Sequence, residues 1–476
     1  MDYKEKIQKL VDEIKAQGYE NVCFMQPAYN IGGGPLIEAQ LARYLADNTN
    51  LNLYFYDYHQ GYGEFLLKDN PKVKKITYKD NDTDFPLKEK CILITDSTRV
   101  VLLKKMHPES KFLFWHYQTN PCGWEHVLIN NESKKYLNLT KKENAMVYHD
   151  WSGRNSLSRY TGVNFLNKDY IHIVIDKKNK ECSFDLINKD EINICFLSRL
   201  ATDKMQALFN LVKNFATYKT DKKKRLHVIG DGKTRKQVEE YCKKYENEIE
   251  FVFTGSIARE NLDDYLIKNV DILFGVGTCV VEGAALKLPS VVLILDMKEF
   301  DDLEAFWLYN SKEYTVGILK EQKKDLKIKY TKIHDILDEI YSKNNKKKNG
   351  ENCYKYYIRN HENYDQFAYN FLNSLKNTTL TYKKIKKCIK YIPYSQYSHE
   401  LYKLKKLTII KKITFFNKTK WLLFGFIEIF KEKRLTKESK YYILGIPCKK
   451  TSKKVWDFPA ARFDNRKDYL GGENVK

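Results

Sequence analysis

The stretch VDILFGVGTCVVEGAALKLPSVVLIL, residues 270–295, combines the elements that decide the fold. An apolar run of strand length stands at each end of it. Between the two runs, Gly275 and Gly277 end the first strand, Thr278 is suited to cap a helix, and Pro289 ends that helix. A strand, a helix and a second strand in this order predict one unit of a parallel α/β sheet.

The same alternation extends in both directions along the chain. We expect further strands at residues 21–26, 51–56, 91–95, 111–115, 145–148, 193–197, 226–229 and 250–253. Apolar residues at helical spacing predict helices at residues 7–14, 37–45, 207–218, 333–341 and 364–375. The fold class expected is therefore α/β, built from parallel sheets.

A charged stretch divides this pattern into two parts. We predict a first Rossmann-like domain at residues 1–176, a linker at 177–190, and a second Rossmann-like domain with closing helices at 191–377. Residues 378–476 follow as a basic extension. Its leucines and isoleucines from 401 to 413 recur every three residues, a spacing that drifts around a helix, so no secondary structure is predicted there.

The net charge of +22 is concentrated in the last quarter of the chain. Residues 1–350 carry 55 basic and 50 acidic side chains, a net of +5, whereas residues 351–476 carry 28 and 11, a net of +17. This excess suits an anionic membrane surface or a nucleic acid, or is simply a solvated lysine-rich surface. We expect no membrane span, no secretory signal, and reduced cysteines rather than disulfides, which together predict a cytoplasmic protein, peripheral at most on the inner membrane face.

Three elements of the second domain suit a diphosphate. Arg199 follows the strand 193–197, and Lys204 lies five residues beyond it, where open α/β sheets bind ligands. Gly277 and Thr278 open a helix whose first amides are suited to an anion. Glu282, in the same helix, suits the hydroxyls of a ribose. Taken singly, each has a structural alternative: a surface ion pair, tight packing, or a helix-dipole effect.

These motifs resemble those of GT-B glycosyltransferases of the retaining family 4, the glycosyl transferases group 1. The matching stretches are Ser198-Arg199-Leu200 with Lys204, Ile229-Gly230-Asp231-Gly232, Phe253-Thr254-Gly255, and residues 274–282. The resemblance implies a GT-B fold, with the two domains facing a cleft. It also implies that Arg199 and Lys204 hold the donor diphosphate and that Glu282 holds the ribose. Phe274 departs from the pattern, because the family has there a glutamate that contacts the donor sugar.

Two stretches of the first domain are assigned to the same cleft. Gly33 and Gly34 belong to a glycine loop that the family places against donor or acceptor; a plain strand-to-helix turn is the alternative. His116 stands where the family has a cleft histidine, and we predict it as the catalytic residue; a structural histidine is the alternative. His149 and Asp150 are weaker candidates and are left outside the predicted site.

The predicted function is transfer of a sugar from a nucleotide-sugar donor to a saccharide or lipid-linked acceptor in envelope polysaccharide synthesis. By resemblance, the anomeric configuration would be retained. We expect no metal and no other cofactor, an anionic membrane surface as partner, and no nucleic acid. A non-catalytic GT-B scaffold, a nucleic-acid-binding protein and a sugar-nucleotide epimerase are the alternatives.

Overall fold

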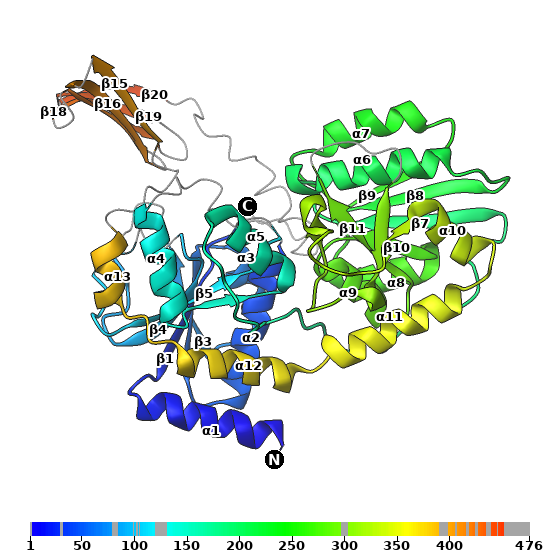
Figure 1. Ribbon diagram of the computed structural model, residues 1–476, viewed down its shortest axis with the longest axis horizontal. Helices are drawn as coiled ribbons and strands as arrows, with labels where there is room; N and C mark the ends of the chain where they lie inside the picture. Colours follow the sequence, from blue (N-terminus) through cyan, green and yellow to red (C-terminus); the bar gives the residue numbers. More distant parts are fainter. Residues whose placement is uncertain are drawn as a thin grey trace.

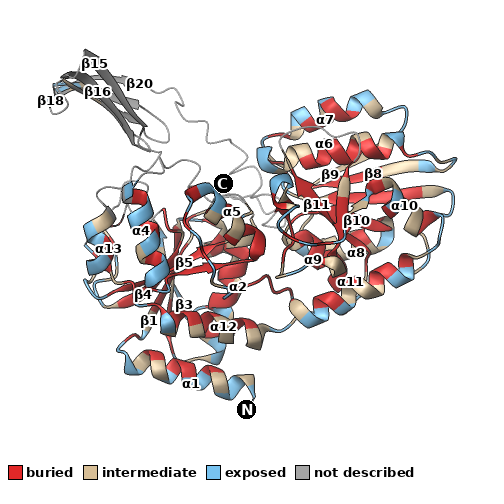
Figure 2. Cartoon of the chain, in the orientation of Figure 1, coloured by how far each residue is buried: buried red, intermediate tan, exposed pale blue. Residues whose placement is uncertain are grey.

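The computed structural model describes residues 2–28, 32–78, 84–98, 100, 103, 105–119, 131–296, 303–389 and most of 398–451. It contains two α/β domains and a separate antiparallel sheet (Figure 1). Buried residues concentrate in the central strands of the two domains and on the helix faces that cover them (Figure 2).

The first domain is a six-stranded sheet in the order β3-β2-β1-β4-β5-β6, with every neighbouring pair parallel. Its strands are β1 (Asn21–Met25), β2 (Asn52–Tyr58), β3 (Val73–Tyr78), β4 (Cys91–Thr95), β5 (Lys111–His116) and β6 (Met146–Tyr148). Its helices include α1 (Tyr3–Ala16), α2 (Gly33–Asn48), α3 (Tyr62–Leu66), α4 (Asn131–Lys142) and α5 (Trp151–Thr161). Strands β4 and β5 are buried throughout because neighbouring strands and helices cover them, which explains their continuous apolar sequence.

The second domain repeats this plan. Its sheet has the order β14-β12-β11-β10-β7-β8-β9, and β13 pairs with β11. The strands are β7 (Glu191–Leu197), β8 (Lys223–Ile229), β9 (Glu250–Gly255), β10 (Ile272–Gly275), β11 (Ser290–Leu295), β12 (Glu304–Trp307), β13 (Ile318–Leu319) and β14 (Thr331–Lys332). The helices are α6 (Thr202–Thr217), α7 (Arg235–Cys242), α8 (Arg259–Asn269), α9 (Thr278–Ala285), α10 (Ile333–Tyr341) and α11 (Lys346–Asn360).

The strand orders fix where each domain is suited to bind a ligand. In both, the first strand lies between a strand that follows it directly and one that comes later in the chain: β1 between β2 and β4, β7 between β8 and β10. Ligands of open α/β sheets bind beyond the carboxyl ends of the strands at this switch point. The predicted α/β class with two Rossmann-like domains is confirmed, and the ends of β7 and β10 carry the motifs singled out in the sequence.

The chain returns to the first domain at its end, and here the predicted boundaries differ from the structure. Helix α12 (Tyr364–Asn377), assigned above to the second domain, packs on α1 of the first domain. Phe371 stacks on Phe24, with ring centroids 5.6 Å apart, and lies 6.0 Å from Trp115. Its helical periodicity indicated a packed face, but periodicity does not tell which domain that face meets.

The folded part also continues beyond residue 377. The amide of Phe112 donates to the carbonyl of Leu380, and that of Tyr382 donates to Ser110. Helix α13 (Tyr382–Ile389) then packs beside α4 and buries Ile385. The first domain therefore includes residues up to 389, which the sequence analysis placed in the basic extension.

The basic extension contains a third sheet. Six antiparallel strands follow one another in chain order: β15 (Ser398–Leu404), β16 (Leu407–Phe415), β17 (Lys418–Leu423), β18 (Ile427–Arg434), β19 (Ser439–Ile443) and β20 (Ile446–Thr451). The three-residue spacing considered above thus comes from strands rather than from a helix. The alternation Ile427-Glu428-Ile429 is the strand signal that the helical test missed.

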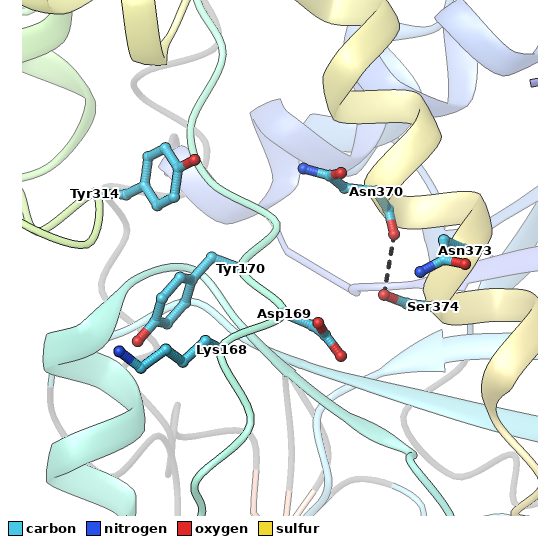
Figure 3. Close-up of a pocket in the computed structure, with 7 residues that line it drawn as sticks. All are labelled: Lys168, Asp169, Tyr170, Tyr314, Asn370, Asn373 and Ser374. Carbon is cyan, nitrogen blue, oxygen red and sulfur yellow. Dashed lines mark hydrogen bonds between the residues drawn. The ribbon is translucent and has the colours of Figure 1, made fainter. Parts of the chain in front are cut away.

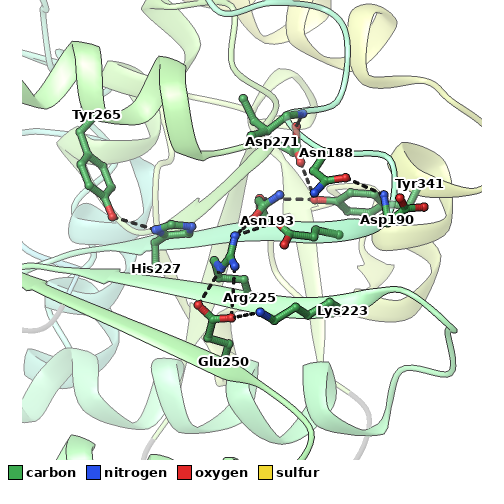
Figure 4. A network of polar contacts seen from close by, with 12 residues as sticks. Asn188, Asp190, Asn193, Lys223, Arg225, His227, Glu250, Tyr265, Asp271 and Tyr341 are labelled. Carbon is green, nitrogen blue, oxygen red and sulfur yellow. Dashed lines mark hydrogen bonds and ion pairs between the residues drawn. The ribbon is translucent and has the colours of Figure 1, made fainter.

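The second sheet is fastened at its amino-terminal edge by a network of charges (Figure 4). Arg225 on β8 pairs with Glu191 on β7 at 2.6 Å and with Glu250 on β9 at 3.0 Å. The side chains of Arg225 and Glu191 are partly buried, and that of Glu250 is more exposed. Nearby, Lys346 and Asp271 form a fully buried pair at 2.7 Å. This edge lies opposite the carboxyl ends of the strands, so the network stabilises the sheet and leaves the other end to the candidate site.

Two further expectations are tested by the described part of the chain. The eight cysteines described there are free, and seven of them are buried, which agrees with reduced thiols. Among the described residues, no helix is both long and apolar enough to cross a membrane.

Candidate active site

The loop after β7 is shaped by two glycines of the β8 loop. The amide of Ser198 donates to Ile229, and that of Leu200 donates to Asp231. A Cβ on Gly230 would lie 2.0 Å from the carbonyl oxygen of Ser198, and one on Gly232 would lie 2.3 Å from that of Leu200. Only glycine fits such a close approach of two backbones. The motif at 229–232 therefore acts by holding the segment 198–200, which carries Arg199.

Arg199 and Lys204 both lie at this switch point. Arg199 is exposed and makes no ion pair with any residue that the structure describes. The side chain of Lys204 is about one fifth exposed, and its ammonium lies 3.8 Å from the carboxylate of Asp203, which is a loose contact. Burial and, to a smaller extent, the charge of Arg199 lower the pKa of Lys204, while Asp203 and Cys279 oppose this. A cation held in these conditions is stabilised by a bound anion.

Helix α9 begins beside these two cations. Its N-cap is Gly277, at φ +86°, and no atom lies within 4 Å of the place where a Cβ would stand. Thr278 was predicted as the cap, but it is the first helical residue, and the cap position makes no side-chain hydrogen bond. The amides of a first helical turn lack acceptors within the helix, so this end is suited to an anion.

The glycine loop of the first domain meets the same point. Gly32 is the N-cap of α2, so Gly33 and Gly34 are the first residues of a helix rather than of a loop. A Cβ on Gly33 would lie 3.3 Å from Cγ2 of Thr278, in the second domain. One on Gly34 would contact Gln26 and Tyr117 at 3.6 and 3.7 Å. The N-termini of α2 and α9 thus face each other across the domain boundary, and both carry partial positive charge.

Glu282 is buried and already paired. Its carboxylate lies 2.9 Å from Lys178 and 3.1 Å from Arg259, the first residue of α8. Burial acts to lower the pKa of Lys178, but Glu282 and then Asp263 outweigh it and raise that pKa. Lys178 belongs to the predicted linker, which packs along the second domain. The sequence analysis identified Glu282 but neither of its two partners, because they are distant in sequence. Its role toward a ribose stays a prediction.

His116 ends β5 and is buried. Its carbonyl accepts from the amide of His149 at 2.9 Å, and its ring lies edge-on to that of Tyr148, with centroids 6.2 Å apart. A Cβ on Gly153 would lie 3.1 Å from its Cδ2, so the first turn of α5 covers the imidazole closely. These contacts suit the structural alternative as well as a cleft histidine, and its catalytic role stays a prediction.

Asp57 was not predicted, yet it joins the backbone at Ala28 to the first turn of α3. This buried carboxylate accepts from the amides of Ala28 at 2.8 Å, Gly63 at 2.9 Å and Glu64 at 3.2 Å. Burial raises its pKa to about 6, against the lowering effect of these hydrogen bonds. An acidic residue within an otherwise apolar strand, LYFYDY, was the available signal.

Two cavities lie outside the candidate site. One of about 130 Å³ lies between α12 and the segment 168–170 (Figure 3); its lining residues are Lys168, Asp169, Tyr170, Tyr314, Asn370, Asn373 and Ser374. A neighbouring cavity of about 190 Å³ shares Asp169 and Ser374 with it. None of the predicted site residues lines either cavity. The candidate site is defined here by the switch point and by the charges that lie at it.

A comparison with protein families matches part of the second domain. Residues 178–293 match the family described as glycosyl transferases group 1, a segment that contains Arg199, Lys204, Gly277, Thr278 and Glu282. No curated protein matches the chain by sequence.

Solved structures resemble the chain only distantly. The Anabaena protein Alr3699/HepE, solved with UDP and glucose, is 12% identical at a TM-score of 0.47, over 72% of this chain and 96% of that one. A glycosyltransferase from Rickettsia africae is 15% identical at a TM-score of 0.45, over 78% and 99%. The fold assignment comes from the strand orders and the family match. The chain therefore has two Rossmann-like domains, as in the GT-B architecture, and residues 178–293 match the family described as glycosyl transferases group 1.

Proposed function

We propose that this protein transfers a sugar from a nucleotide-sugar donor to a saccharide or lipid-linked saccharide acceptor in the synthesis of an envelope polysaccharide. The observation that carries the proposal is the convergence, at one switch point, of Arg199, Lys204 and the N-terminus of α9. The first domain closes this point, since Gly33 lies against Thr278.

The mechanism follows from where these charges lie. As the bond between sugar and diphosphate breaks, negative charge develops on the leaving diphosphate. Arg199 and Lys204 would neutralise it, and the facing ends of α2 and α9 would add their partial positive charge. We propose that the nucleotide ribose binds at Glu282, whose carboxylate Lys178 and Arg259 hold in place. No metal is needed in this scheme, because side chains and helix ends supply the positive charge.

The residue that departs from the family pattern does not take part. Phe274 lies within β10 and is fully buried in the core of the second domain. A side chain in that position has no access to a donor sugar. We therefore propose that contacts to the sugar come from the first domain, with His116 as the candidate catalytic residue, and that the configuration at the anomeric carbon is retained.

The experiment is a donor screen on the full chain. Release of free nucleotide is followed from a panel of UDP-, GDP- and CMP-activated sugars, with and without saccharide acceptors. Acceptor-dependent release supports the proposal. Nucleotide binding without release would instead favour the non-catalytic scaffold, and a changed sugar nucleotide without acceptor would favour an epimerase.

We also propose that the acceptor lies at an anionic membrane surface on the cytoplasmic side. Helix α13 presents Lys383, Lys386 and Lys387 outward while Ile385 packs inward. The net charge of +17 after residue 350 includes these lysines. A row of cations on one face of a helix suits lipid headgroups more than base recognition, which requires stacking or groove contacts.

A further inference from the structure

One buried carboxylate of the first domain reaches the second domain. Asp150 is the N-cap of α5, 3% exposed, and its Oδ1 accepts from the amide of Gly153 at 2.8 Å. Its Oδ2 accepts from the amide of Val316 at 3.4 Å. Val316 belongs to residues 311–322 of the second domain, which we call the docking segment. A single side chain thus caps a helix in one domain and holds the backbone of the other.

The docking segment also contacts the candidate site. The carbonyl of Val316 accepts from the amide of Gly277 at 2.8 Å, and Gly277 is the N-cap of α9. A Cβ on Gly317 would lie 2.4 Å from Val276, so the segment packs tightly against the strand-to-helix turn. Two hydrogen bonds therefore connect Asp150 to the cap of the helix that faces Gly33 and the two cations.

Other contacts fasten the docking segment to the first turn of α5. The amide of Trp151 donates to Glu313 at 3.2 Å, and the side chains of Ser152 and Gln322 bond at 2.7 Å. These anchors hold the ends of the segment. In the middle of the segment, the ring of His172 stacks on that of Tyr314 with centroids 4.1 Å apart, and Asp150 holds Val316, the residue bonded to Gly277.

We propose that Asp150 is a positioning residue, which sets the cap of α9 in its anion-binding conformation when the two domains are docked. This inference rests on the proposed function, because only under that function does the N-terminus of α9 bind a donor diphosphate. The position is unfavourable for a charge: burial raises the pKa of Asp150 to about 7, against the lowering effect of hydrogen bonds from Gly153, Val316 and Ser152. A carboxylate kept where its ionisation is disfavoured is common at functional sites.

The test separates the cap of α5 from the contact to Val316. Asp150→Ser keeps a good N-cap, but its single short hydroxyl cannot also reach the second domain. Asn363→Ser is the matched control, because Asn363 caps α12 by accepting from Gln366 at 2.9 Å and lies outside the candidate site. Amide hydrogen exchange is measured on the full chain without ligand, and donor kinetics follow for both variants.

We expect the amides of Val316 and Gly277 to exchange roughly tenfold faster in Asp150→Ser, because the variant loses one hydrogen bond to the docking segment. The amides of α5 should keep their protection from exchange, because the helix is still capped. The kcat should fall with little change in the donor KM, because the cap is set for the developing charge. Unchanged exchange at Gly277 would overturn the coupling, whatever the activity. If no donor is turned over by the wild type, the proposed function fails, and the exchange result alone still decides whether Asp150 sets the cap.

Discussion

The two domains share one plan of parallel strands but present different chemistry at the same place in it. At its switch point the second domain offers cations, Arg199 and Lys204, beside a glycine-opened helix. The first domain offers glycines, a buried histidine and a buried aspartate that fixes its loop. Topology thus marks the same edge in both domains, and the side chains at that edge give the two domains different chemistry.

The comparison also shows how each domain's glycines work. In the second domain, Gly230 and Gly232 allow two backbones to touch within the domain. In the first domain, Gly33 leaves room for a residue of the other domain. The glycines of the second domain act within that domain, whereas Gly33 acts at the boundary between the two domains.

The largest effect is expected where a glycine builds the site. Gly230→Ala places a Cβ 2.0 Å from Ser198, at φ +130°, so the loop that carries Arg199 must move. We expect the second domain to lose about 3 kcal/mol of unfolding free energy or more, and nucleotide binding with it. The matched variant is Gly277→Ala, at φ +86° and ψ −140° with no atom within 4 Å; backbone strain alone should cost it about 1–3 kcal/mol, less than the clash in Gly230→Ala adds. Denaturant unfolding of both variants checks this, and equal losses would contradict it.

A second expected difference between the domains is their response to acid. His227 on β8 is a buried histidine within the sheet of the second domain; its ring bonds to Tyr265 at 2.8 Å, and burial lowers its pKa from 6.5 to about 4. The neutral His227 ring is compatible with the folded state above pH 6.5. Between pH 6.5 and pH 4 this histidine takes up a proton in the unfolded chain but not in the folded one, so the free energy of unfolding decreases as the pH falls through this range. The loss amounts to about 3 kcal/mol.

His227→Gln should remove most of this acid sensitivity from the second domain. The first domain should keep its own, because burial lowers the pKa of His149 there to about 3 and the pKa of His172 well below its usual value. Asp57 and Asp150 oppose them, since burial raises their pKa values. Hydrogen exchange at pH 7 and pH 4.5, resolved by domain, provides the measurement. An unchanged response of the second domain would mean that His227 is not the responsible group.

Much of this architecture follows from local sequence, and the exceptions are instructive. The strand 91–95 and the helix 333–341 have the predicted bounds, because apolar periodicity and nearby stop signals agree there. The position of Arg199 followed likewise from a strand end. Asp150 could not be placed, since its partner Val316 is 166 residues away. The same reason applies to α12 and to the strands after residue 397. Which domain α12 packs on, and which strands pair in the last sheet, depend on contacts between residues distant in sequence, and local patterns do not contain this information.

The next smaller effect concerns the cations. Arg199→Ala should reduce turnover roughly ten- to hundredfold, which corresponds to one charged hydrogen bond of about 1.5–3 kcal/mol in the transition state. Arg159→Ala is the control, because Arg159 is a partly exposed arginine of the first domain paired with Asp325 at 2.6 Å. It should leave turnover unchanged. Steady-state kinetics with the donor found in the screen measure both, and a wild-type rate in Arg199→Ala would exclude that residue from the site.

The smallest effect on the site is expected from removing the last sheet. A chain of residues 1–389 keeps α12 and α13 on the first domain, so nucleotide affinity should stay within about twofold of the full chain. A chain of residues 1–377 loses Leu380, Tyr382 and Ile385 from the core and should melt at a lower temperature.

Vesicle binding separates the two roles of the extension. Each cation near an anionic leaflet contributes about 1 kcal/mol, and the attraction fades within a Debye length. Residues 1–389 should therefore bind anionic vesicles more weakly than the full chain, and salt should release both. Equal binding of the full chain to neutral and anionic vesicles would exclude an electrostatic role. Loss of nucleotide binding in residues 1–389 would instead make the last sheet part of the site, and the comparison would then involve three regions rather than two.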